Sequence, residues 1–314
     1  MGTERVPRFS VKCMKKPRLR GFLNLAIALV AGNVAGFTVA TYNVENYTLA
    51  DRMVDGVFRR AYPKPEDAKA SLRRVLRAID ADVVILQEMG PRPFLAELQE
   101  DLAREGLRYG FAHVMSAADP DRHLAVLSRS EPHSFSDYTD LTFKYLARQE
   151  SAKRGLLHLE YRLGSHRLSI FGVHLKSRHT DTPEDPESAG RRAGEATAMR
   201  NRILENHPDP ERDLFLILGD FNDHKASRPV RAFLRRGKTI IADLVPAADK
   251  DGDAWTYRYA KEDSYDRVDL MLASRALMRH ISPGAARIPD GPDVAAASDH
   301  RPVVVSIDLP GVAK

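Results

Sequence analysis

Short apolar segments alternate with amphipathic segments through residues 37–309, and this alternation restricts the fold more than any other feature. The five apolar residues at 214–218 predict a buried strand, and residues 66–79 place apolar side chains on one helical face. Other strands are expected at 37–44, 81–88, 123–129, 155–163, 167–175, 267–274 and 301–309, and other helices at 93–107, 191–206 and 229–237. No linker divides these segments, so the pattern favours one domain of two packed sheets with helices outside.

The first 36 residues differ from the rest of the chain in charge. They hold seven basic residues and one acid, so residues 37–314 carry 41 basic and 42 acidic side chains. The formal net charge of +5 is therefore a property of the N-terminus. A near-neutral body argues against tight non-specific binding to duplex DNA, because that binding grows with the number of phosphates neutralised.

Residues 14–36 have the pattern of a secretory signal peptide. A basic start precedes an apolar run at 22–31, and small residues follow it. We expect a secreted or periplasmic protein with a mature start between about residues 32 and 37, and Met14 as the alternative translation start. The other interpretation is a first buried strand or helix. The single cysteine, Cys13, lies before the apolar run, so the body forms no disulfide.

Polar and ionisable residues stand at the ends of six apolar segments. They are Asn43, Glu45 and Asn46; Gln87 and Glu88; His174 and Lys176; Asp220, Asn222, Asp223 and His224; Asp266 and Asp269; and Ser298, Asp299 and His300. One such cluster is usually a solvated turn. Six clusters at strand ends are different, because carboxylates crowded together without a cation are costly. They predict a shared site for metal and phosphate.

The order of the motifs YNVEN, LQE, GVHLKS, GDFND, DRVDLMLAS and SDHRPV resembles the endonuclease/exonuclease/phosphatase superfamily. This superfamily of metal-dependent phosphoesterases includes deoxyribonuclease I, AP endonucleases, inositol-phosphate phosphatases and bacterial sphingomyelinases. The resemblance implies a four-layered α/β sandwich, in which two packed mixed β-sheets are flanked by helices. Its motifs span residues 39–305, and we expect one domain at 37–309, between the signal-like segment 1–36 and a tail at 310–314.

The resemblance also implies a Mg²⁺ or Mn²⁺ ion. A hard cation of this kind prefers oxygen ligands and keeps several waters. Glu88 is the expected first ligand, Asn43 matches the family's amide at the metal, and Asp299 and Glu45 are further candidates.

Catalytic roles follow from the same resemblance. Asp220 matches the residue that positions and deprotonates the attacking water, and Asn222 would direct its amide at the phosphate. His300 and His174 would stabilise the transition state. A carboxylate must orient His300, and Asp269 is preferred for this task, with Asp266 left open. Asp223 and His224 are expected only to shape the loop.

The substrate is less constrained than the reaction. Lys176, Arg178 and His179 could bind phosphates, although solvated surface is the alternative for the last two. Arg59 and Arg60 lie in a stretch where basic and aromatic residues interleave, and Trp255 and Tyr257 precede Asp269. Such interleaving suits nucleic acid, so a nuclease is the first hypothesis. A phospholipid, inositol-phosphate or other small-molecule phosphoesterase is the second, and a non-catalytic binding module the third. We expect a monomer without a stable protein partner.

Overall fold

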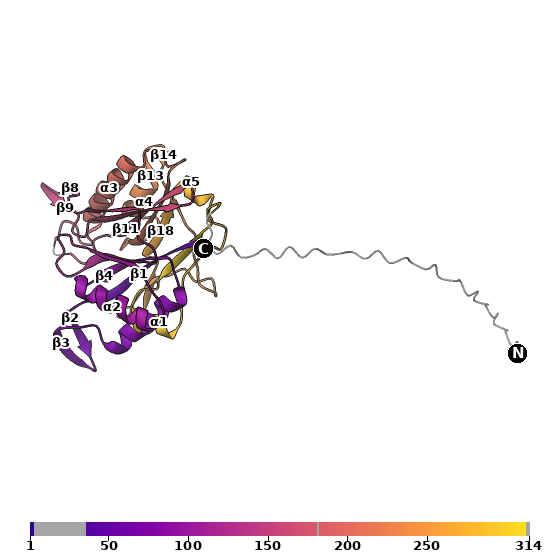
Figure 1. Cartoon of the computed structure of the whole chain (residues 1–314), viewed down its shortest axis with the longest axis horizontal. Coiled ribbons are helices and arrows are strands. Elements are labelled where there is room, and N and C mark those ends of the chain that lie inside the picture. Colours follow the sequence, from indigo (N-terminus) through magenta and orange to yellow (C-terminus); the bar gives the residue numbers. More distant parts are fainter. Residues whose placement is uncertain (3–35, 181, 312–314) are drawn as a thin grey trace. The chain divides into compact units, whose positions relative to one another are not determined.

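Two six-stranded sheets form the centre of the structure, a computed structural model that describes residues 1–2, 36–180 and 182–311 (Figure 1). The first sheet has the order β19–β20–β1–β4–β6–β5 and the second the order β15–β18–β12–β11–β10–β7. The strands of the first sheet are β19 (Ala286–Arg287), β20 (Val303–Ile307), β1 (Phe37–Tyr47), β4 (Val83–Met89), β6 (His123–Ser128) and β5 (Phe111–Met115). Those of the second are β15 (Asp243–Leu244), β18 (Asp269–Ala273), β12 (Leu214–Asp220), β11 (His166–His174), β10 (Leu156–Leu163) and β7 (Ser134–Tyr138).

Alternation along the central strands creates three apolar layers. In β4, Val83 and Ile85 pack between the sheets, whereas Val84 and Leu86 face the outer side. In β12, Leu216 also packs between the sheets, while its neighbours belong to the outer layer of the second sheet. Because successive side chains of a strand point to opposite faces, strands buried on both faces read as continuous apolar runs.

Helices cover the outer face of each sheet. Apolar residues of α1 (Glu66–Ile79), α2 (Arg92–Arg104) and α6 (Pro292–Ala297) pack on the first sheet, and those of α3 (Ala189–Asn206) and α4 (Arg228–Leu234) pack on the second. Figure 1 shows the two groups of helices on opposite sides of the sheets. The short helix α5 (Arg275–Met278) follows β18. The predicted four-layered α/β sandwich is thus confirmed.

Strand direction brings the polar strand ends to one edge. Strands β1 and β4 are parallel, as are β11 and β12, so the C-terminal ends of each pair lie together. Strand β18 is antiparallel to β12, and β20 is antiparallel to β1, so these two contribute residues from their N-terminal ends. Asn43, Glu88, His174, Asp220 and Asp269 therefore collect where the chain enters or leaves the sheets.

Four two-stranded hairpins lie outside the main sheets, and the sequence prediction did not include them. They are β2 (Ala50–Val54) with β3 (Val57–Tyr62), β8 (Thr142–Tyr145) with β9 (Arg148–Ser151), β13 (Arg235–Arg236) with β14 (Thr239–Ile240), and β16 (Tyr257–Tyr259) with β17 (Ser264–Asp266). Among the described residues, no helix has the length and apolar character needed to cross a membrane. The predicted signal-like segment lies, apart from its two ends, outside the described residues.

Candidate active site

Gly219 sets the close approach of β11 and β12 beside the candidate catalytic residues. Its φ is +143°, and a Cβ at this position would lie 1.9 Å from the carbonyl oxygen of Val173. Only glycine avoids that clash. The next residue pair in the register, His174 and Asp220, is thereby brought together, with 3.6 Å between His174 Nε2 and Asp220 Oδ2.

Amide groups surround the carboxylate of Asp220. Its Oδ1 accepts a hydrogen bond from the backbone N–H of Asn222 at 2.8 Å, and its Oδ2 accepts from the side-chain amides of Asn43 and Asn222, each at 3.1 Å. The Asn222 amide also donates to the Leu175 carbonyl at 2.9 Å. Asp220 is buried, and this burial raises the pKa of Asp220 to about 7, although the positive charge of His300 opposes the rise. A carboxylate with a pKa near neutrality is suited to take a proton from water.

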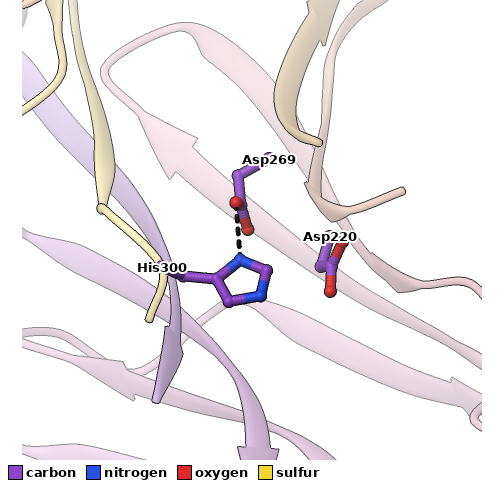
Figure 2. A group of neighbouring side chains, drawn as sticks. All are labelled: Asp220, Asp269 and His300. Atoms are coloured by element: carbon purple, nitrogen blue, oxygen red, sulfur yellow. Dashed lines mark hydrogen bonds and ion pairs between the residues drawn. The ribbon is translucent and has the colours of Figure 1, made fainter. Parts of the chain in front are cut away.

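Asp269, and not Asp266, contacts His300. Asp269 Oδ2 lies 2.8 Å from His300 Nδ1, and both residues are buried. A dashed line marks this contact in Figure 2. Burial opposes a charged imidazole, but the adjacent Asp269 outweighs it and raises the pKa of His300 well above the usual value. Asp266 instead forms an ion pair with Arg178 at 3.2 Å. The structure therefore places the preferred carboxylate beside His300 and the alternative away from it.

His174 differs from His300 in charge. Burial lowers the pKa of His174 well below the usual value, and the positive charges of Arg154 and His300 add to the effect. Its Nδ1 is buried and has no hydrogen-bond partner among the described residues. The two histidines thus present one neutral and one charged ring to the same space around Asp220.

Three carboxylates, those of Glu45, Glu88 and Asp299, form an acidic rim beside this pair of histidines. Asp299 is exposed, but the surrounding protein partly desolvates its carboxyl group and raises the pKa of Asp299 to about 6. The carboxylates of Glu45 and Glu88 also raise this pKa, whereas the positive charge of His300 lowers it. Glu88 accepts a hydrogen bond from the Asn46 N–H at 3.0 Å. Crowded carboxylates of this kind favour a bound cation.

The donor set of the rim fits a hard divalent ion. Glu88, Glu45 and Asp299 supply carboxylate oxygens. Within the part of the chain that the structure describes, the Asn43 side-chain oxygen accepts only the Glu45 N–H, at 3.0 Å, which leaves a lone pair free. Oxygen donors are what Mg²⁺ and Mn²⁺ prefer. These four residues, the ones that the sequence predicted, could hold the ion.

A second group could also hold a metal. Ligand atoms of Asp220, Asp269 and His300 lie within 4.8 Å of one another, and no other three potential ligands among the described residues lie as close together as this limit. However, Asp269 already occupies Nδ1 of His300, and the raised pKa of His300 favours an imidazolium without a free lone pair. The open acidic rim is chemically the better cation position.

Among the predicted phosphate-binding residues, Lys176 and Arg178 lie near the site but have partners. The ammonium of Lys176 donates to the Ser177 carbonyl at 3.2 Å and to the His179 carbonyl, and Arg178 pairs with Asp266. Arg59 and Arg60 lie on the exposed strand β3 of the first hairpin. Substrate would have to displace the contacts of Lys176 and Arg178 before they could bind its phosphate.

Asp223 has a structural partner that the sequence did not predict. It is buried, and Arg192 of α3, which is 1% exposed, donates to Asp223 Oδ2 at 3.1 Å. The exposed side chain of His224 lies 3.8 Å from Asp223. Asp223 thus fixes the loop after β12 to helix α3, in agreement with a loop-shaping role.

Several residues to which the sequence assigned no role at the site position its side chains. The buried Thr256 hydroxyl accepts the N–H of Asp269 at 3.0 Å, and Ser298 Oγ donates to the Asn43 carbonyl at 2.8 Å and accepts the His300 N–H at 3.1 Å. Lys64 is buried and donates to the Glu45 carbonyl at 3.1 Å, with its ammonium 3.6 Å from the Glu45 carboxylate. None has a local sequence signature of its role.

Backbone strain also marks the site. Glu45, Asn46, Glu88 and Asn222 all adopt positive φ values, between 46° and 61°. Non-glycine residues in this region cost of order 1 kcal/mol or more each and tend to cluster at functional sites. Here they turn the strand ends so that the polar side chains face one another.

Comparisons with known proteins give a family match. A family model described as "Endonuclease/Exonuclease/phosphatase family" matches residues 40–300. A search of curated proteins found no match.

Solved structures with similar folds include an endonuclease/exonuclease/phosphatase family protein from Leptotrichia buccalis, with 15% identity, a TM-score of 0.60 and coverage of 87% of this chain and 100% of that one. The human Nocturnin catalytic domain has 15% identity, a TM-score of 0.59 and coverage of 86% and 93%. Sphingomyelinase C from Streptomyces griseocarneus has 17% identity, a TM-score of 0.57 and coverage of 87% and 99%. At identities of 15–17%, these similarities show a shared fold and do not assign an activity.

Proposed function

The chain belongs to the endonuclease/exonuclease/phosphatase family, whose members hydrolyse phosphoester bonds, and from this premise we propose that it is a secreted phosphodiesterase that depends on Mg²⁺ or Mn²⁺. One observation carries the proposal: the buried Asp269–His300 pair lies beside Asp220, whose carboxylate is held by two side-chain amides. An ion pair buried in this way needs a reason, because removing two charges from water is costly. Acid–base chemistry at a phosphate supplies that reason.

In this proposal each residue has a defined task. Asp220 orients the attacking water and accepts its proton. His300, held charged by Asp269, and the neutral His174 donate hydrogen bonds to the phosphate oxygens, where negative charge grows in the transition state. Asn222 is a further amide donor. The acidic rim and Asn43 would hold the cation, which when bound neutralises charge on the phosphate oxygens.

Nucleic acid is the first candidate substrate. The ring of Tyr257 lies 4.7 Å from that of His300, and Arg258, Tyr259 and Tyr265 are exposed on the same hairpin. Aromatic and cationic side chains together suit bases and backbone phosphates.

A phospholipid headgroup is the second candidate, and the apolar side chains exposed on the β2–β3 hairpin favour it. The similar fold of Sphingomyelinase C makes this alternative worth testing. We further propose that the enzyme acts as a monomer.

A substrate panel tests the proposal. Plasmid DNA, single-stranded RNA, sphingomyelin and an inositol phosphate are each incubated with Mg²⁺ and with excess chelator. We expect hydrolysis of at least one substrate in Mg²⁺ and none in chelator. Glu88→Gln should lower activity and raise the Mg²⁺ concentration needed for half-maximal rate, because it removes one negative ligand. Full activity in chelator would exclude the metal-dependent mechanism, and no hydrolysis of any substrate would favour a non-catalytic binding module.

A further inference from the structure

The β2–β3 hairpin exposes apolar side chains that nothing in the described structure covers. Met53, Val57 and Phe58 are 62%, 52% and 57% exposed, and Leu49 at the base of the hairpin is 51% exposed. Met53 and Phe58 are paired across the two strands and so lie on the same face. Neither strand joins a main sheet. Figure 1 shows the hairpin standing out from the body at the lower left of the view.

The hairpin has a defined shape despite its exposure. Asp55 and Gly56 form its two-residue turn with φ values of 51° and 75°, the positive angles that the favoured tight hairpin turn requires. A hairpin of two strands alone is marginally stable in water. A regular turn that presents Val57 and Phe58 to solvent therefore indicates a surface for a partner.

Arg52 attaches the hairpin to the edge of the active site. Its guanidinium donates to the carbonyl oxygens of Asn46 at 2.9 Å, Thr48 at 3.1 Å and Tyr62 at 3.1 Å. Asn46 in turn donates its N–H to Glu88 in the acidic rim. Any surface that the hairpin enters is thus brought to the same end of the molecule as the candidate active site.

Charge beside the apolar residues indicates the chemistry of the partner. Arg59 and Arg60 directly follow Phe58, are exposed, and form no ion pair among the described residues. With Asp51, Arg52 and Asp55, residues 50–62 carry a net charge of +1. An apolar end flanked by guanidinium groups matches the boundary between acyl chains and phosphate headgroups.

We propose that this hairpin docks onto a phospholipid bilayer, with Met53, Val57 and Phe58 entering the headgroup–acyl boundary and Arg59 and Arg60 contacting lipid phosphates. Nucleic acid fits less well, because bases stack on aromatic rings. Phe58 is the one aromatic residue among the four exposed apolar side chains named above. The four exposed apolar side chains are also far fewer than the roughly 20 residues or more per partner of a standard protein interface. The proposal concerns where the chain binds and does not depend on the hydrolysis proposed above.

Vesicle sedimentation of the full chain tests the proposal. Vesicles of phosphatidylcholine with a minor fraction of phosphatidylglycerol are used with chelator present, so that catalysis plays no part. We expect the wild-type chain to sediment with the vesicles and Met53→Ser/Phe58→Ser to lower the partition coefficient by about tenfold or more, since two apolar side chains are lost. Arg59→Gln/Arg60→Gln should weaken binding chiefly on vesicles that contain phosphatidylglycerol, and high salt should remove that difference.

The matched control is Leu146→Asn, which removes an exposed apolar side chain from the turn between β8 and β9. Asparagine tolerates the positive φ of 50° at this position, and this variant should sediment as the wild type does. All variants share the apolar segment 22–31, so differences between them report the hairpin, provided that circular dichroism shows equal folding. The proposal is overturned if the wild type stays in the supernatant or if Met53→Ser/Phe58→Ser sediments equally well. It is also overturned if that variant loses oligonucleotide binding while vesicle binding is unchanged.

Discussion

At the scale of single residues, the pairing of Asp269 with His300 distinguishes two carboxylates that the sequence left as alternatives. Both precede or begin β18, and both lie in motifs that the family uses. The 2.8 Å contact of Asp269 with His300 and the ion pair of Asp266 with Arg178 assign them different surroundings. We expect Asp269→Asn to lower turnover much more than Asp266→Asn, because only Asp269 holds the imidazole in its charged form and orientation.

Steady-state rates of the two variants, with circular dichroism as the check of folding, measure this difference. On the scale of a positioned acid–base group, the loss at Asp269 should be on the order of a hundredfold. Equal losses in both variants would mean that the contact with His300 is not what matters.

The sequence alone indicated the chemistry of the site but not the residues that hold its side chains in position. Asp220, Glu88, His174 and His300 stand at strand ends, where an abrupt change from apolar to ionisable residues is visible in one chain. Thr256 and Lys64 act through contacts with the backbone and side chains of residues far along the chain, and no local pattern encodes such contacts. The motif favoured Asp269 over Asp266 as the partner of His300. The structural reason is the antiparallel register of β12 and β18, which pairs Asp269 with Asp220 and so places it in the site.

At the scale of elements, the ion pair of Arg192 and Asp223 connects helix α3 to the loop after β12. Both side chains are buried, so removing one partner leaves an uncompensated charge. Asp223→Asn should lower the free energy of unfolding by about 3 kcal/mol. Chemical denaturation measures this value, and Arg192→Met/Asp223→Leu should be less destabilised than the single variant, since an apolar pair avoids the buried charge.

A double variant as unstable as Asp223→Asn would show that packing, and not charge, dominates this contact. Asp223→Asn is for the same reason an unsuitable control for substitutions at Asp220, even though both are aspartates of one loop. His224→Gln is the better choice, because His224 is exposed and has no assigned role.

Elements with strong periodicity were the ones that could be predicted. The helix expected at 66–79 has those bounds in the structure, and the central strands lie where apolar runs placed them. The helix expected at 229–237 ends at Leu234, because Arg235 and Arg236 are extended and pair with Thr239 and Ile240. The β2–β3 hairpin was not predicted although its Asp55–Gly56 turn is a hairpin signal, because the segments on either side of the turn do not alternate regularly between apolar and polar residues.

At the scale of the whole molecule, a buried histidine couples stability to pH. His158 of β10 stacks on Phe171 of β11, and its Nε2 lies 3.0 Å from Ser169 Oγ. Burial lowers the pKa of His158 to about 4, helped by His207 and opposed by Glu160. The pKa of His158 in the unfolded chain is about 6.5. At pH values between this pKa and that of the folded protein, His158 binds a proton in the unfolded chain but not in the native protein. Stability from this group is therefore complete above about pH 6.5 and falls as the pH decreases toward 4.

Urea denaturation at a series of pH values tests this coupling. His158→Phe keeps an aromatic ring in the stack but cannot titrate, so its free energy of unfolding should fall less between pH 7 and about 4 than that of the wild type. The difference should approach about 3 kcal/mol, the full effect of the shift in pKa. Parallel curves for the two proteins would show that other groups control the acid sensitivity.

The central claim is that residues from both sheets act together on one phosphate. Asp220 ends β12 of the second sheet, and His300 lies three residues before β20 of the first. The direct measurement is a double-mutant cycle of Asp220→Asn and His300→Ala on the turnover of whichever panel substrate is hydrolysed, with His224→Gln as control. Each single variant should lose on the order of a hundredfold or more while remaining folded. The double variant should lose less than the product of the two, because both residues stabilise one transition state. Turnover close to that of the wild type in both single variants would contradict the account.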